Sequence, residues 1–206
     1  MTTQPTVFIV DDDASVRKSL ARLMQAHGRK AVDFPSAEDF LRRHDPRQPG
    51  CLVLDLSMPG IDGLVLQRQL DTADIPLPIV FITGHGTIPA SVQAMKAGAI
   101  DFLTKPVGQD VLLRAIDAAI EKDRVTRQRR EEIAAIEARL SALTPREREV
   151  LTYVVAGKVN KQIAGALGTV EKTIKVHRSR VMQKLGVTSV AELVKLAGRV
   201  GIVGPS

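Results

Sequence analysis

The stretch from Cys51 to Gly63, CLVLDLSMPGIDG, constrains the fold of this chain more than any other. Its first half, Leu52 to Leu54, is a short apolar run without a helical period, which is typical of a strand covered on both faces. Asp55 ends that strand. The chain must then turn at Met58-Pro59-Gly60, because proline cannot donate to a ladder and glycine accepts dihedrals that other residues avoid. An aspartate at the carboxyl end of a buried parallel strand lies where open α/β sheets bind their ligands.

Strand-like and helix-like patterns alternate strictly along the first 120 residues. Apolar runs predict strands at 6–10, 30–34, 52–55, 79–82 and 100–103, and apolar residues at spacings of three and four predict a helix after each. Asp13 and Asp62 stand where helix N-caps belong. Five strands and five helices in this order predict a doubly wound α/β domain with a parallel sheet.

Chemically active side chains follow four of these strands. Asp11 and Asp12 follow the first strand, Asp55 ends the third, Thr83 the fourth, and Lys105 follows the last. Because parallel strands bring their carboxyl ends to one edge of a sheet, we expect these side chains to meet.

The expected cluster has a specific chemistry. Three carboxylates gathered together repel one another and need a cation to stay ionised. Oxygen ligands without histidine or cysteine select a hard ion, and Mg²⁺ is the natural one. With Lys105 and Thr83 available to neutralise and bond phosphoryl oxygens, Asp55 is left as the nucleophile. The sequence therefore predicts transfer of a phosphoryl group onto Asp55.

These motifs resemble the receiver domain of two-component response regulators over residues 5–120. The resemblance implies a flavodoxin/CheY-like sheet of strand order 2-1-3-4-5 and phosphorylation of Asp55 by a sensor histidine kinase. It also implies that Asp12, Asp55 and the main-chain carbonyl of Ser57 ligate Mg²⁺, with Asp11 assisting through water. Lys105 would pair with the phosphoryl group, and the Lys105-Pro106 bond would be cis.

The same resemblance implies a switch. Thr83 would move toward the phosphate, and Phe102 would turn inward to fill the space. Phe102 stands where a tyrosine is commoner, so its inward position would depend on packing alone. Ser57 and His85 would face the phosphoryl group and tune its hydrolysis.

Charge divides the chain into two unlike parts. The net charge is +6, but residues 1–120 carry 12 Lys and Arg against 14 Asp and Glu, while residues 121–206 carry 17 against 9. The second part is suited to an anionic partner. The single cysteine, Cys51, is expected to be a buried, inert thiol. The sequence contains neither a membrane-length apolar run nor a signal peptide, which favours a cytoplasmic location.

Residues 121–140 form a charged segment without glycine or proline, and we expect a helical linker there. Ile133, Ile136, Leu140 and Leu143 recur at spacings of three and four, which gives one narrow apolar stripe. Such a stripe suits a pairing seam between two protomers as well as a docking face.

Residues 141–206 have the pattern of a four-helix helix-turn-helix domain. Thr144-Pro145-Arg146-Glu147 predicts an N-cap, a first-turn proline and a capping box. The four helices are expected at about 145–156, 161–167, 171–185 and 189–199. Within the motif we single out Lys161, Gly168, Thr173 and His177.

The third of these helices can be divided into two faces at about 100° per residue. Val170, Ile174, Val181 and Leu185 are expected to face the core, and His177 to lie beside it with a packing or hydrogen-bonding role. The opposite face is cationic and suits a major groove: Lys172, Lys175, Val176, Ser179, Arg180 and Gln183.

The stretches LTPREREVL, NKQIAGALG and TIKVHRSRVMQKLGV resemble the LuxR-type DNA-binding domain. The whole chain resembles the FixJ/NarL family, and most of all its FixJ branch, which includes the styrene-response regulators. The resemblance implies a regulator, not an enzyme, that dimerises when phosphorylated, binds double-stranded promoter DNA and works with RNA polymerase, as an activator. Thr169, Val170, Lys172 and Ile174 depart from the pattern, so no operator sequence is carried over.

Two rival functions stay open. A phosphatase could use an aspartyl-phosphate intermediate on a similar sheet, but it would want a second acid where Ser57 stands. An orphan regulator would have a receiver that is never phosphorylated and only mediates contacts.

Overall fold

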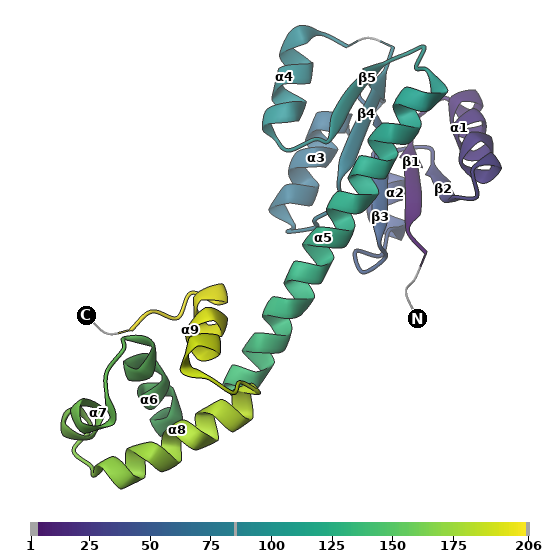
Figure 1. Cartoon of the computed structure of the whole chain (residues 1–206). Helices are drawn as coiled ribbons and strands as arrows, with labels where there is room; N and C mark the ends of the chain where they lie inside the picture. The colour runs from purple at the N-terminus through teal and green to yellow at the C-terminus, as the bar shows by residue number, and fades with distance from the viewer. Residues whose placement is uncertain (1–3, 85, 205–206) are drawn as a thin grey trace. The chain divides into compact units, whose positions relative to one another are not determined.

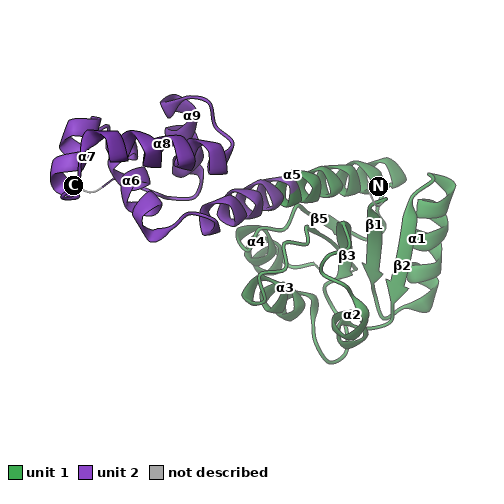
Figure 2. Ribbon diagram, turned by 90° about the horizontal axis from the view of Figure 1, so that it is seen from below, with its two compact units in different colours: residues 1–127 green, residues 128–206 purple. Residues whose placement is uncertain are grey.

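The structure is a computed structural model that describes residues 4–84 and 86–204. The chain divides into two compact units, residues 1–127 and 128–206, drawn in green and purple in Figure 2. Helix α5 (Gln109–Ser141) contributes residues to both units.

The first unit is a five-stranded sheet with helices on both faces (Figure 1). The strands are β1 (Thr6–Val10), β2 (Lys30–Phe34), β3 (Gly50–Asp55), β4 (Ile79–Thr83) and β5 (Asp101–Thr104). They lie in the order β2-β1-β3-β4-β5, and every neighbouring pair is parallel. The predicted fold and strand order are therefore confirmed.

Alternate residues of each strand point to opposite faces, and each face has its own core. Phe8, Leu52 and Phe81 pack on the side of α2 (Ala37–Arg43), α3 (Gly63–Thr72) and α4 (Ile88–Lys96). Val7, Val53 and Val80 pack on the side of α1 (Ala14–Ala26) and α5. Because the sheet is covered on both sides, its central strands are apolar throughout, as the run at Leu52–Leu54 predicted.

Side-chain caps determine where the helices of this unit begin. Asp13 accepts the backbone N–H of Ser15 ahead of α1, and Asp62 accepts that of Val65 ahead of α3. Both predicted N-caps are confirmed.

A buried polar cluster anchors α5 to the amino-terminal edge of the sheet. The carboxylate of Asp123, which is 1% exposed, accepts the backbone N–H of Gly50 at 2.9 Å and the Nε–H of Arg127 at 2.9 Å. Arg127 also donates to the carbonyls of Pro46, Arg47 and Gln48. Residues 121–127 are thus packed as part of the first unit.

The second unit contains the carboxyl-terminal part of α5 and four helices: α6 (Pro145–Val155), α7 (Asn160–Ala166), α8 (Glu171–Leu185) and α9 (Val190–Arg199). The predicted capping box is present at Thr144 and Glu147. Gly186 ends α8 in a left-handed conformation, with φ of +69°, which glycine adopts without strain.

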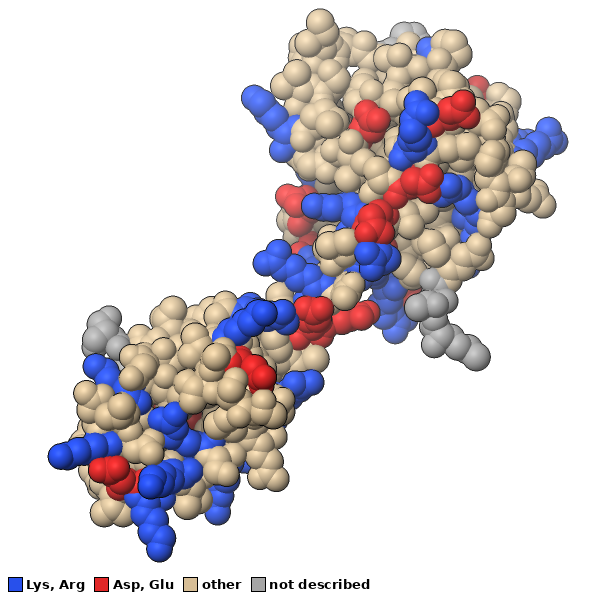
Figure 3. Space-filling model, viewed as in Figure 1, with Lys and Arg blue, Asp and Glu red and all other residues tan. Residues whose placement is uncertain are grey.

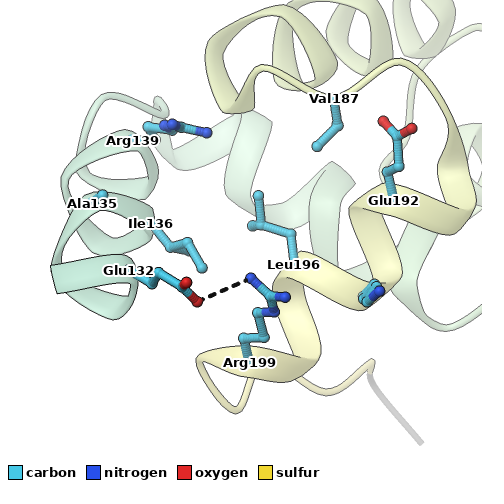
Figure 4. Close-up of a pocket in the computed structure, with 9 residues that line it drawn as sticks. Glu132, Ala135, Ile136, Arg139, Val187, Glu192, Leu196 and Arg199 are labelled. Atoms are coloured by element: carbon cyan, nitrogen blue, oxygen red, sulfur yellow. Dashed lines mark hydrogen bonds and ion pairs between the residues drawn. The ribbon is translucent and has the colours of Figure 1, made fainter. Parts of the chain in front are cut away.

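The apolar stripe of α5 is a docking face within this second unit. Ile136, Leu140 and Leu143 are buried against residues of α6 to α9, including Val150 and Leu193. Beside them lies a pocket of about 340 Å³, and two of its lining residues, Glu132 and Arg199, form an ion pair at 3.5 Å (Figure 4). Ile136, Leu140 and Leu143 are therefore covered, and the structure shows docking for this part of the stripe. Ile133 is half-buried and lies outside this core.

The prediction that Val170 faces the core was wrong. Val170 is 64% exposed, because it is the N-cap residue of α8 and lies outside the helical turn that faces the core. The stripe of Ile88, Val92 and Met95 on α4 is exposed, and Ala94 is the buried residue of that helix. No helix within residues 4–84 and 86–204 combines the length and apolarity needed to cross a membrane.

Candidate functional site

The carboxyl edge of the sheet brings together three of the predicted side chains. Lys105 donates from Nζ to Asp11 Oδ2 at 2.7 Å and to Asp55 Oδ1 at 3.2 Å. Asp11 and Asp55 are 1% and 5% exposed. Asp55 ends β3, Asp11 directly follows β1, and Lys105 directly follows β5, so strands far apart in sequence build one charged cluster.

The cluster holds more negative charge than its single lysine relieves. Burial raises the pKa of Asp55, and the charge of Asp11 raises it further, while Lys105 opposes both. Burial alone would lower the pKa of Lys105, but its hydrogen bond and charge interactions with Asp11 and Asp55 outweigh burial, and the pKa is raised. A second cation at this edge would stabilise both carboxylates in their ionised form.

The donor set fits a hard divalent ion. The two buried carboxylates, the carboxylate of the exposed Asp12 and the main-chain carbonyl of Ser57, itself an exposed residue, offer only oxygen atoms, which is the preference of Mg²⁺. Among the described residues, no three acidic, histidine or cysteine side chains gather into a ready metal group. Lys105 thus links Asp11 to Asp55. The Asp12 side chain lies at the same edge of the sheet but is not part of this hydrogen-bonded cluster.

The loop after Asp55 is held by a residue that the sequence analysis missed. Glu38 Oε1, at the start of α2, accepts the backbone N–H of Ile61 at 3.1 Å. A Cβ at Gly60 would lie 2.6 Å from the same oxygen, and Gly60 has a φ of +78°. Glycine is favoured in the predicted turn for its left-handed dihedral, and any other residue there would also displace the Glu38 carboxylate.

Thr83, at the end of β4, and Phe102, on β5, lie close together beside Gly86. Thr83 is fully buried, and the Phe102 ring packs on Phe81 with 5.9 Å between ring centroids. A Cβ at Gly86 would lie 2.9 Å from the Phe102 ring and 3.1 Å from the Thr83 methyl group, so the ring occupies space that this glycine leaves open. His85 lies outside the described residues. The Lys105-Pro106 peptide bond is cis, as the resemblance implied.

In the second unit, the predicted outer face of α8 is exposed along its whole length. Ile174, Val181 and Leu185 are at most 1% exposed, which leaves the opposite face to solvent. The exposed residues are Lys172, Lys175, Val176, Ser179, Arg180 and Gln183. Lys and Arg side chains gather on this unit over the region of α7 and α8 (Figure 3).

Two polar contacts hold α8 in place. Lys184 donates to Glu147 at 2.7 Å, and Glu147 also accepts the backbone N–H of Thr144 at 2.9 Å. These hydrogen bonds lower the pKa of Glu147, that from Lys184 most. Arg178 donates to Asn160 at 3.0 Å and so joins α8 to the start of α7. The capping-box contact was predicted, but the Lys184–Glu147 and Arg178–Asn160 contacts were not, because each joins different helices.

The remaining motif residues take structural positions. Gly168 is left-handed, with φ of +61°, in the turn between α7 and α8, and Lys161 is exposed on α7. Thr173 and His177 are half-buried on α8. Within the described residues the Nδ1 atom of His177 is buried and has no hydrogen-bond partner, so this atom makes no bond of the expected kind.

Comparison with known proteins agrees with both units. Residues 7–117 match the family described as response regulator receiver domain, and residues 141–197 match the bacterial regulatory proteins of the luxR family. The chain belongs to the two-component response regulators with a LuxR-type helix-turn-helix domain, which bind DNA and regulate transcription.

Individual relatives are similar over almost their full length. Nodulation protein W of Bradyrhizobium diazoefficiens is 43% identical over 97% of this chain and 88% of its own. The transcriptional regulatory protein FixJ of Rhizobium meliloti is 43% identical over 99% of this chain and 100% of its own. The low-resolution structure of the response regulator StyR is 49% identical, has a TM-score of 0.87, and covers 96% of this chain and 100% of its own. The predicted family, including its styrene-response members, is confirmed.

Proposed function

We propose that Asp55 is the phosphoacceptor of this regulator and that its phosphorylation by a sensor histidine kinase switches binding to promoter DNA. The observation that carries the proposal is the contact of Lys105 with both Asp11 and Asp55 at one edge of the sheet. A nucleophilic carboxylate beside a fixed cation, with a second acid in reach, is the arrangement that phosphoryl transfer to aspartate needs.

Each side chain at the edge has a role in this step. An oxygen of Asp55 forms the new bond to phosphorus as the bond to the kinase histidine breaks. Lys105 is already at hydrogen-bond distance from Asp55 and is placed to neutralise a phosphoryl oxygen. Thr83 would supply a hydroxyl to another.

We further propose that Mg²⁺ is held by Asp12, Asp55 and the Ser57 carbonyl, with Asp11 assisting through water. When bound, the ion would offset the charge that develops on the phosphoryl oxygens. The proposal is supported by the oxygen-only donor set and by the raised pKa of Asp55, which burial and the charge of Asp11 cause.

The output of the switch is proposed to be a homodimer. Phosphorylation adds charge and acceptors near Thr83 and Phe102, and so favours the state in which both are drawn inward. The exposed Ile88, Val92 and Met95 on α4 offer an apolar face that a second receiver could cover. Two DNA-binding units held together would bind two half-sites with a joint affinity far above that of one.

On DNA we assign the exposed face of α8 to the major groove and the flanking lysines and arginines to phosphates. Lys175 and Arg180 are the central cations of that face. Such a regulator would work in the cytoplasm as an activator that contacts RNA polymerase.

Incubation with Mg²⁺ and acetyl phosphate, followed by intact mass measurement, tests the phosphoacceptor. The native chain should gain one phosphoryl group, and Asp55→Asn should gain none. Asp62→Asn, which alters an acid that caps α3 in the same loop, serves as the matched control and should still be modified. A chain that never gains the group would instead support the orphan regulator.

A second assay, with p-nitrophenyl phosphate in place of acetyl phosphate, tests the phosphatase rival. A regulator accepts one group per chain, whereas a phosphatase would release many phosphates per chain from p-nitrophenyl phosphate. Sustained turnover that Asp55→Asn abolishes would contradict the proposed function.

A further inference from the structure

Arg17, a residue of α1 that the motifs do not include, makes an unusual set of contacts beside the charged cluster. Its Nη1 donates to the main-chain carbonyl of Asp11 at 2.7 Å and to that of Asp12 at 3.0 Å. Its Nε donates to Asp33 Oδ2, on β2, at 3.2 Å. The side chain is 13% exposed, so this guanidinium is packed against the loop and is not a solvated surface charge.

The two acids of this loop differ in how they are held. Both oxygens of the Asp11 carboxylate are engaged: Oδ1 accepts the backbone N–H of Asp13 at 2.8 Å, and Oδ2 accepts Lys105 at 2.7 Å. The Asp12 side chain is exposed. Asp12 is instead held through its main chain, because Arg17 donates to its carbonyl.

Holding these carbonyls has a geometric effect. A planar peptide whose oxygen is held cannot rotate, so the Cα–Cβ bond of the residue between two such peptides keeps its direction. Arg17 engages the peptides on both sides of the Asp12 Cα, because the carbonyls of Asp11 and Asp12 belong to those two peptides. Only the side-chain torsions of Asp12 then have to be ordered when it binds a cation.

We propose that Arg17 is a positioning residue that presets the main chain of Asp12 for the divalent cation. This inference rests on the magnesium site proposed above. Residues that orient the ligands of a metal typically change its affinity by about 10- to 100-fold when they are removed. Arg17 is proposed to contact neither the phosphoryl group nor the cation. It therefore acts on the affinity for the cation and not on the chemical step.

The test is a titration of the full chain with Mg²⁺ by calorimetry, for the native chain and three variants. Arg17→Ala should raise the dissociation constant by about 10-fold. The dissociation constant of Arg17→Lys should lie between those of the native chain and Arg17→Ala. An ammonium can reach one carbonyl, but it does not have the forked shape of the guanidinium. Asp33→Asn is the matched control: it removes the charge partner of Arg17 but leaves both carbonyl contacts, and should stay within about twofold of the native chain.

A second readout separates positioning from mere stability. At saturating Mg²⁺ all four chains should gain the phosphoryl group from acetyl phosphate at rates within about threefold of one another. An unchanged dissociation constant in Arg17→Ala, or an equal loss in Asp33→Asn, would overturn the inference. If Arg17→Ala does not fold, a native-like dissociation constant in Arg17→Lys would overturn it as well. A native chain that does not bind Mg²⁺ would instead refute the magnesium site itself.

Discussion

The two functional surfaces of this chain are built in opposite ways. In the receiver, Asp11, Asp55 and Lys105 lie at the ends of three strands, the two acids are buried, and Lys105 contacts both. In the DNA-binding unit, Lys175 and Arg180 come from one helix and stand exposed, while the other face of that helix is buried. The first surface depends on tertiary convergence, and the second depends on the period of one helix.

This difference predicts how each surface responds to substitution. Groups that share hydrogen bonds at a buried site change one another's ionisation, so their effects should be coupled. Exposed side chains on a helix interact mainly with the partner, so their effects should be nearly additive.

The largest effect is expected at Lys105. Lys105→Ala leaves Asp11 and Asp55 buried without their shared cation, and removes the charge placed for a phosphoryl oxygen. We expect phosphorylation by acetyl phosphate to slow by roughly 100-fold or more, measured as the rate of mass gain. Lys96→Ala, an exposed lysine in the last turn of α4, is the control and should react at the native rate.

At the recognition helix, Lys175→Ala and Arg180→Ala should each weaken DNA binding by about 1–3 kcal/mol. The double variant should lose the sum of the two within about 0.5 kcal/mol, as measured by fluorescence anisotropy on a selected site. Lys122→Ala, which removes a charge outside the helical unit, should bind as the native chain does. Strong coupling between the two substitutions would contradict the expectation that effects on this exposed helix face are additive.

Acid should destabilise the two units over different pH ranges. Burial lowers the pKa of His44, and Arg127 lowers it further while Asp45 opposes, so below about 6.5 the unfolded receiver takes up a proton that the folded one resists. Stability of the receiver should therefore fall as the pH drops from that value, and His44→Gln should remove this step.

The second unit should keep its stability to a lower pH than the receiver does. The pKa of Glu147 is lowered, so its contribution is complete above the ordinary glutamate value of about 4.3 and is lost only as the pH falls through the folded value. Urea unfolding followed by the fluorescence of Tyr153, the single tyrosine, reports this unit alone. A loss of its stability already near pH 6 would contradict the assignment.

The smallest effect is expected at the ion pair of Glu132 with Arg199. Its side chains are 49% and 52% exposed, so solvent screens the attraction. The coupling free energy between Glu132→Gln and Arg199→Gln should stay below about 1 kcal/mol in urea unfolding. A larger value would show that exposed pairs in this unit behave like the buried pairs of the receiver.

Sequence reasoning found whatever depends on local pattern. Strand ends located Asp11, Asp55, Thr83 and Lys105, because the edge at which parallel strands end is a rule of topology. Helical periodicity placed the exposed face of α8. The fold class was therefore predictable from pattern, whereas the strand order and the family came from the resemblance of the motifs to a known family.

Contacts made across the fold were not predictable. Arg17, Glu38 and Arg127 act through main-chain carbonyls and N–H groups, which carry no sequence signature. Periodicity also misplaced Val170, and the apolar residues that marked α4 correctly as a helix are exposed. It reports that one face of a helix is apolar, but not whether that face is turned toward the core of its own unit.

The reactivity of Cys51 can report how often the sheet opens. This residue is the single cysteine, it is fully buried in the central strand, and burial raises the pKa of its thiol to about 12. The thiol can react with a disulfide reagent only after the sheet opens and exposes it. The rate of this reaction therefore measures the opening of the sheet, and no added label is needed. For the same reason, a cysteine introduced at an exposed position such as Ser179 could carry a dye while the native thiol stays silent.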